Sequence, residues 1–155
     1  MTVRTHIRQM NGSGGGPLDD LIRPYPDQIR YALNQMDGTS FWALSIWRAP
    51  EGANLLEDIP FSEDYIQCAG SAEALTVELR VVDADGTAHQ YVIGTPGATP
   101  TGEPSETIPW DDGRRSTRVY PNEVFTADEA ADLFYAYFLT DTVPDTYQRR
   151  ELHLG

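Results

Sequence analysis

The chain has 155 residues, of which 40% are hydrophobic, and a formal net charge of −13 at pH 7. This length suits one domain with a hydrophobic core, and the aromatic residues spread along the chain exclude a disordered acidic tail. The negative charge disfavours binding to nucleic acid or to anionic membranes, and it favours a basic protein partner.

The N-terminus and the cysteine content indicate a cytoplasmic protein. Residues 1–6 lack the apolar segment of a secretory signal, and no apolar run approaches the roughly 20 residues that cross a bilayer. Cys68 is the only cysteine, which excludes an internal disulfide and fits a reducing compartment. We therefore expect a cytoplasmic protein without a membrane anchor.

The first third of the chain predicts a strand, a helix and a second strand. Alternation over Val3–Gln9 predicts the first strand, and the glycine-rich segment Gly12–Pro17 is expected to break regular structure. A helix is predicted from Pro26 to Met36, with Gly38 just past its end. Ser40–Arg48 has apolar residues on both faces, so we expect it to be a central strand. Trp42, Leu44 and Ile46 are expected on one face, and Phe41, Ala43 and Trp47 on the other.

The middle of the chain contains its clearest hairpin. A short strand is predicted at Tyr65–Ala69, and clean alternation over Ala74–Val82 predicts a longer one. The turn Asp83–Gly86 then leads into a partner strand, His89–Ile93. Thr95–Ser116 is rich in proline, glycine and acidic residues and is expected to be a long loop.

The last third predicts a strand, a helix and a closing strand. Arg118–Tyr120 is a short strand candidate, and Thr126 with Glu129 forms a capping box that begins a helix. The buried stripe of this helix ends at Phe138, and Thr146–Leu152 is expected to close the sheet. The whole pattern predicts a single α+β domain over residues 1–155, with an antiparallel or mixed sheet of about five to seven strands packed with two main helices.

Motifs for catalysis, cofactors or metals do not emerge from the sequence. The run Gly12–Gly16 lacks the Lys-Ser/Thr ending of a phosphate loop, and Asp83–Gly86 lacks the later glutamate of a calcium loop. The histidines have no ligand-like spacing, and Cys68 is expected to pack as a small apolar group. We therefore predict no catalytic residue, no cofactor and no metal site. A small hydrolase remains an alternative that requires dispersed histidines or carboxylates to converge in a pocket.

Acidic loops around an aromatic residue are the strongest candidate for a binding surface. Carboxylates steer a cationic partner, and an exposed aromatic side chain anchors it after docking. In the alternative interpretation, Trp110 folds back onto the core and the acidic residues only maintain solubility. The candidate contacts are Glu57, Asp58, Trp110, Asp111 and Asp112.

Three stretches of the chain follow one another in a recognisable order and spacing. They are Pro26–Gly38 followed by Phe41–Trp47, then Leu75–Gly86 with Tyr91–Gly94, and finally Val119–Thr126 leading into Ala130–Leu139 and Pro144–Leu152. In order and spacing they resemble the first-numbered immunity-protein family of bacterial polymorphic toxin systems.

This resemblance implies a specific partner and a mode of action. It implies an α+β protein that binds a cognate toxin in a one-to-one complex inside the producing cell. Toxins paired with this family are commonly nucleic-acid deaminases, whose basic substrate groove an acidic protein can occlude. The resemblance supplies no catalytic residues. A non-catalytic acidic adaptor or secretion chaperone that binds a basic partner is the alternative function.

Overall fold

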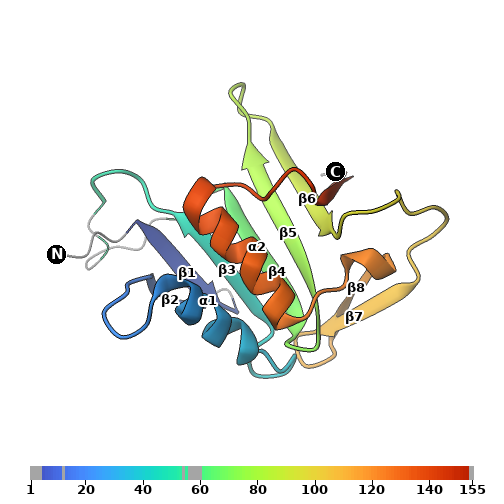
Figure 1. Cartoon of the computed structure of the whole chain (residues 1–155), viewed down its shortest axis with the longest axis horizontal. Helices are drawn as coiled ribbons and strands as arrows, with labels where there is room; N and C mark the ends of the chain where they lie inside the picture. The colour runs from blue at the N-terminus through green and yellow to red at the C-terminus, as the bar shows by residue number, and fades with distance from the viewer. Residues whose placement is uncertain (1–4, 12, 54, 56–60, 154–155) are drawn as a thin grey trace.

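The structure is a computed structural model that describes residues 5–11, 13–53, 55 and 61–153. Within these residues, helices α1 (Tyr25–Asn34) and α2 (Ala127–Thr140) lie side by side on one face of a β-sheet (Figure 1). The other elements are β1 His6–Met10, β2 Ser13–Pro17, β3 Ala43–Arg48, β4 Tyr65–Ser71, β5 Ala74–Val82, β6 Ala88–Gly94, β7 Glu106–Trp110, β8 Arg115–Val119, the 3-10 helix η1 Pro121–Glu123, and β9 Gln148–Leu152.

The described strands form one large antiparallel sheet and one small ribbon. Seven of them pair in the order β2-β1-β3-β4-β5-β6-β9, while β7 pairs only with β8. The predicted α+β class is confirmed, as are the central position of β3, the β5–β6 hairpin and the closing strand β9. No helix in the described part of the chain combines the length and hydropathy that crossing a bilayer requires.

The core lies between the helices and the sheet. Directly paired residues such as Leu44, Cys68 and Val77 point to the same face and are buried against the helices. Phe134 of α2 packs into this layer, as its predicted stripe requires. Each fully buried side chain of this size contributes about 1.5–3 kcal/mol through removal from water, so this layer fixes how α2 lies on the sheet.

Helix α2 begins at the predicted capping box. The Thr126 hydroxyl accepts a hydrogen bond from the backbone N–H of Glu129 at 3.3 Å, and the Glu129 carboxylate accepts one from the backbone N–H of Thr126 at 2.9 Å. The helix ends at Asp141, whose backbone is left-handed (φ 62°) and whose N–H donates to the Tyr137 carbonyl at 2.7 Å. Both ends are therefore fixed by local chemistry.

The glycine-rich segment is a strand, so the prediction that it breaks regular structure is wrong. Residues Ser13–Pro17 form β2, which pairs with β1 and lies at the edge of the sheet. A Cβ at Gly15 would lie 2.9 Å from the Arg8 carbonyl oxygen, so glycine permits this close pairing. At an edge, Pro17 interrupts no second ladder. Gly12 lies outside the described residues.

The prediction that residues 95–116 form one long loop is wrong in part, because this stretch contains β7 and the start of β8. These strands form an antiparallel ribbon that packs on the sheet face opposite the helices. Ile108 and Val119 from the ribbon and Val92 from β6 form a small second apolar cluster. In β7 only Ile108 is buried, and a proline, Pro109, follows it, so the segment shows little of the alternation that predicts a strand.

Candidate functional site

The sheet face opposite the helices carries an open groove beside the β7–β8 ribbon. Ser45 pairs with Gln67, so both side chains point to this face and form a polar floor. The groove holds about 310 Å³. It is called the aromatic groove below, and the aromatic residues that line it are Trp42, Trp47, Phe61, Tyr65 and Trp110.

Trp110 is half-buried on the ribbon side of the aromatic groove. Its ring centroid lies 5.3 Å from that of Trp42, and its indole N–H donates to the Thr117 hydroxyl at 3.0 Å. The guanidinium of Arg115 lies 5.3 Å from the ring centroid. Trp110 therefore packs against the ribbon and the start of β3, while its ring still lines an open surface.

Trp42 does not share a face with Leu44 and Ile46, so that prediction is wrong. The residue precedes β3, in a bent segment that follows Gly38 (φ +80°). Outside the strand, period-two alternation no longer decides where a side chain points. Trp42 packs on Trp110 and lines the aromatic groove, whereas Leu44 is buried on the helix side.

Phe61 and Tyr65 form the opposite side of the groove and were not identified from the sequence. Phe61 is 68% exposed and covers Trp47, which is only 1% exposed, with the ring centroids 5.3 Å apart. Tyr65 lies 6.5 Å from Phe61. Trp47 lies in the predicted central strand, but its aromatic cover comes from a separate connecting segment, and no local sequence pattern indicates that contact.

The turn after Trp110 is less acidic than the sequence suggests. Asp111 and Asp112 both have left-handed backbones, with φ of 53° and 56°. The Asp111 carboxylate lies 3.2 Å from Arg114 and 3.8 Å from Arg115, so its charge is partly compensated within the turn. Asp112 is exposed, and its backbone N–H donates to the Gly38 carbonyl at 2.9 Å. Asp112 is thus the carboxylate of this pair that faces solvent.

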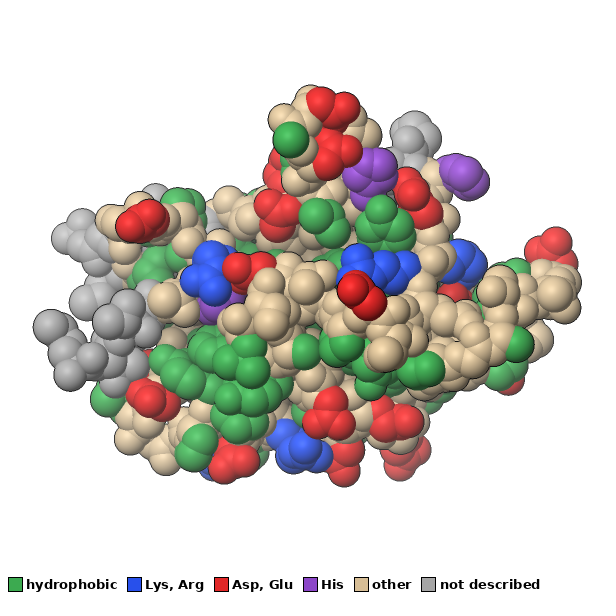
Figure 2. All heavy atoms as spheres, turned by 45° about the horizontal axis from the view of Figure 1, so that its top comes forward, with side chains coloured by type: hydrophobic (Ala, Val, Ile, Leu, Met, Phe, Trp, Pro, Cys, Tyr) green, Lys and Arg blue, Asp and Glu red, His purple; other side chains and the backbone are tan. Residues whose placement is uncertain are grey.

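Glu57 and Asp58, the other two candidate contacts, lie outside the described residues. Elsewhere, acidic side chains gather at the tip of the β5–β6 hairpin, where the turn contains Asp83 and Asp85 (Figure 2). His89 bridges this turn to β9: its ring nitrogens lie 2.9 Å from Asp83 and 2.8 Å from Glu151. Hydrogen bonds to Glu151 and then Asp83 raise the pKa of His89.

A hydroxyl, an imidazole and a carboxylate converge where β1 meets the end of α2. The Thr5 hydroxyl lies 2.8 Å from Nδ1 of His6, and Nε2 of His6 lies 3.4 Å from Asp141. Burial, reinforced by the charge of Arg48, lowers the pKa of His6, which favours a neutral ring. The Nε–H of Arg48 is shared between the two oxygens of the Asp141 carboxylate, at 2.9 and 2.8 Å.

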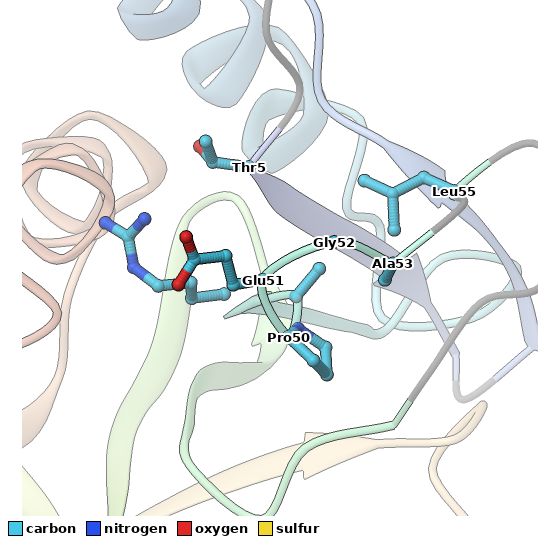
Figure 3. Close-up of a pocket in the computed structure, with 8 residues that line it drawn as sticks. Thr5, Pro50, Glu51, Gly52, Ala53 and Leu55 are labelled. Carbon is cyan, nitrogen blue, oxygen red and sulfur yellow. The ribbon is translucent and has the colours of Figure 1, made fainter.

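These groups are of the types that nucleophilic catalysis uses, and the convergence is the one that the hydrolase alternative requires. However, His6 is 1% exposed and its ring packs 4.5 Å from that of Phe138. Thr5 lines a separate hollow of about 300 Å³, where it lies with Glu51 on one side and Leu55 on the other (Figure 3). The contacts of His6 with Asp141 and Phe138 attach the start of β1 to the end of α2.

The described residues contain no group of three or more histidine, cysteine or carboxylate side chains arranged to hold a metal ion. Cys68 is 1% exposed in the core, where burial raises its thiol pKa to about 12. Its predicted packing as a small apolar group is confirmed.

Comparison with known proteins yields no match: no family model, no curated protein sequence and no solved structure matches this chain.

Proposed function

We propose that this chain is a cytoplasmic immunity protein, a non-catalytic inhibitor that binds a basic bacterial toxin, most simply a nucleic-acid deaminase, and occludes its substrate groove. The observation that carries the proposal is the aromatic groove with Trp110 half-buried on its ribbon side. Large aromatic side chains held in place by neighbours dominate binding energy at protein interfaces. The resemblance in the order of elements supports the class of partner.

The charge of the chain supports a basic partner. A net charge of −13 produces a long-range field that attracts a cationic protein and raises the association rate. Contacts in the groove then act at short range, since the groove itself is lined mainly by aromatic and neutral polar side chains. In this proposal, the net charge sets the association rate of the partner, and the aromatic residues set the dissociation rate of the complex.

Co-expression with the product of the adjacent gene tests the proposal. We expect this chain to restore cell growth and to co-purify with that product as a one-to-one complex. Trp110→Ala is expected to weaken the complex about 30-fold or more, as for an interface anchor. Tyr31→Ala is the matched control, because Tyr31 is an exposed aromatic residue (48%) on α1, on the helix side of the sheet.

Two results separate immunity from its alternative. Growth rescue that depends on Trp110 supports the proposal, provided that the variant unfolds at the same temperature as the wild type. A stable complex without any rescue from toxicity would instead support an acidic adaptor or secretion chaperone. Absence of both rescue and complex, with each protein folded, would refute the proposal.

A further inference from the structure

A further pocket lies where α2 ends over the ends of β3 and β5 and the start of β4. It holds about 450 Å³, within the range of pockets that bind small groups. It is called the α2 pocket below. Its charged residues and its one tyrosine are Arg48, Glu51, Asp64, Arg80, Asp141 and Tyr137.

Tyr137 supplies an unused hydrogen-bonding group in this pocket. The residue is only 2% exposed, and its ring belongs to the core, yet it also lines the pocket. Its hydroxyl makes no hydrogen bond to any other described residue. Among the described residues, the buried side-chain atoms without a hydrogen-bond partner are Oε1 of Gln28 and Oδ1 of Asn122, so the Tyr137 hydroxyl must reach the open space of the pocket, where water can bond to it. The hydroxyl is therefore in place for a group that enters the pocket.

The charges that act on this phenol belong to residues of the same pocket. Burial raises the pKa of Tyr137, the nearby carboxylates of Asp141 and then Asp64 raise it further, and the charge of Arg48 opposes this shift more weakly. The phenol therefore stays neutral at physiological pH and can either donate or accept a hydrogen bond.

The arginines of the pocket are already engaged. Arg48 shares its Nε–H between the two carboxylate oxygens of Asp141, and one terminal nitrogen of Arg80 donates to the Gln90 side chain at 3.2 Å. Among the described residues, the Asp64 carboxylate accepts one hydrogen bond, from the backbone N–H of Val82 at 2.7 Å, and it is otherwise exposed. Three carboxylates against two guanidinium groups leave an excess negative charge.

The end of α2 adds to this negative potential. The carbonyl end of a helix carries a partial negative charge, and the last turn of α2 contains no basic residue. An incoming cation would meet the carboxylate of Asp64, the hydroxyl of Tyr137 and the carbonyl end of the helix. The same groups would repel an anion.

We propose that the α2 pocket receives a basic side chain, arginine or lysine, from the bound partner protein. This inference rests on the proposed function, because it assigns one contact of that complex. The Phe61–Tyr65 segment borders both the aromatic groove and the α2 pocket, so one partner can contact both. The guanidinium or ammonium group would hydrogen-bond to Tyr137 and pair with Asp64.

The pocket itself is tested on the full chain with a small probe. N-acetyl-L-argininamide is titrated while backbone amide resonances are followed by NMR, and its neutral isostere N-acetyl-L-citrullinamide is the control ligand. We expect saturable shifts centred on the end of α2 and the end of β5 with the arginine probe alone. Equal shifts with both compounds, shifts centred elsewhere, or none would overturn the inference.

Two variants identify the residues. Tyr137→Phe removes only the hydroxyl, and Asp64→Asn keeps an oxygen that accepts the Val82 N–H. Each is expected to weaken probe binding about tenfold, the effect of one charge-assisted hydrogen bond. Tyr135→Phe on the same helix and Glu73→Gln in the β4–β5 turn are matched controls outside the pocket, expected to bind as the wild type does.

The same variants in the partner complex separate the two proposals. The pocket inference fails, while the immunity function stands, if the wild-type chain binds the partner and the Tyr137 and Asp64 variants bind it equally tightly. If the probe binds as expected but the adjacent gene product is neither bound nor neutralised, the immunity function fails while the pocket remains a site for basic side chains. A loss of partner affinity confined to the pocket variants supports both.

Discussion

Gly70→Ala tests the packing of the ribbon that shapes the aromatic groove. Gly70, the second-last residue of β4, lies next to β7 with φ +128°, and a Cβ there would lie 2.5 Å from the Ala74 carbonyl oxygen and 2.8 Å from Cγ2 of Ile108. The positive φ costs an alanine about 1–2 kcal/mol, and forcing a methyl group into a packed contact costs about 1–3 kcal/mol more. We therefore expect a loss of about 3 kcal/mol of unfolding free energy.

Gly86→Ala is the control, since it shares the positive φ (+87°) but has nothing within 4 Å of its Cβ. It should lose only about 1 kcal/mol. For a domain of this size these losses lower Tm by about 6–12 °C and about 2–4 °C, measured by thermal unfolding and urea titration. Tryptophan fluorescence should change only in Gly70→Ala, as β7 moves away from Trp42. Equal losses in the two variants would refute the packing argument.

The remaining predictions concern local chemistry. Thr126→Ala should destabilise the protein by about 1 kcal/mol in urea unfolding, and Thr126→Ser should restore most of that loss, because a hydroxyl still caps α2. The pKa of His89 is raised in the folded state. The contribution of His89 to the stability of the fold is therefore fully present below its unfolded pKa, near 6.5, and is lost as the pH rises through its folded pKa. The stability difference from His89→Gln should therefore shrink with rising pH in urea titrations; a difference that grows would contradict the pairing with Glu151. Cys68, with its pKa of about 12, should react with iodoacetamide only after unfolding, and rapid reaction in the native protein would contradict its burial.

The parts of the fold that local sequence determines were the parts that could be predicted. The β5–β6 hairpin needs only alternation and a turn rich in Asp and Gly, and the start of α2 needs only the Thr126–Glu129 pair. The ribbon was missed because its burial depends on a distant partner: Ile108 fits on the sheet only because Gly70 has no side chain. Such a requirement is invisible within either segment alone.

The candidate site was predicted only in part, for a related reason. Trp110 was identified as a possible anchor, but its contacts with Trp42 join segments that the fold alone brings together. The acidity around it was overestimated because Asp111 meets Arg114 and Arg115 within the same turn. Counting carboxylates along a loop does not indicate which of them the fold compensates.

The separation between overall charge and groove chemistry has a kinetic consequence. At about 0.1 M salt the screening length is roughly 10 Å, so a single exposed carboxylate contributes only part of the attraction that the whole chain exerts on a basic partner. Asp112→Asn should slow association modestly and reduce its salt dependence, while Asp111→Asn should have a smaller effect because its charge is already paired. Trp110→Ala should instead raise the dissociation rate and leave association nearly unchanged. Surface plasmon resonance at several salt concentrations distinguishes these effects. If Trp110→Ala changed only the association rate, the groove would guide the partner's approach, and its role as the anchor of the complex would be wrong.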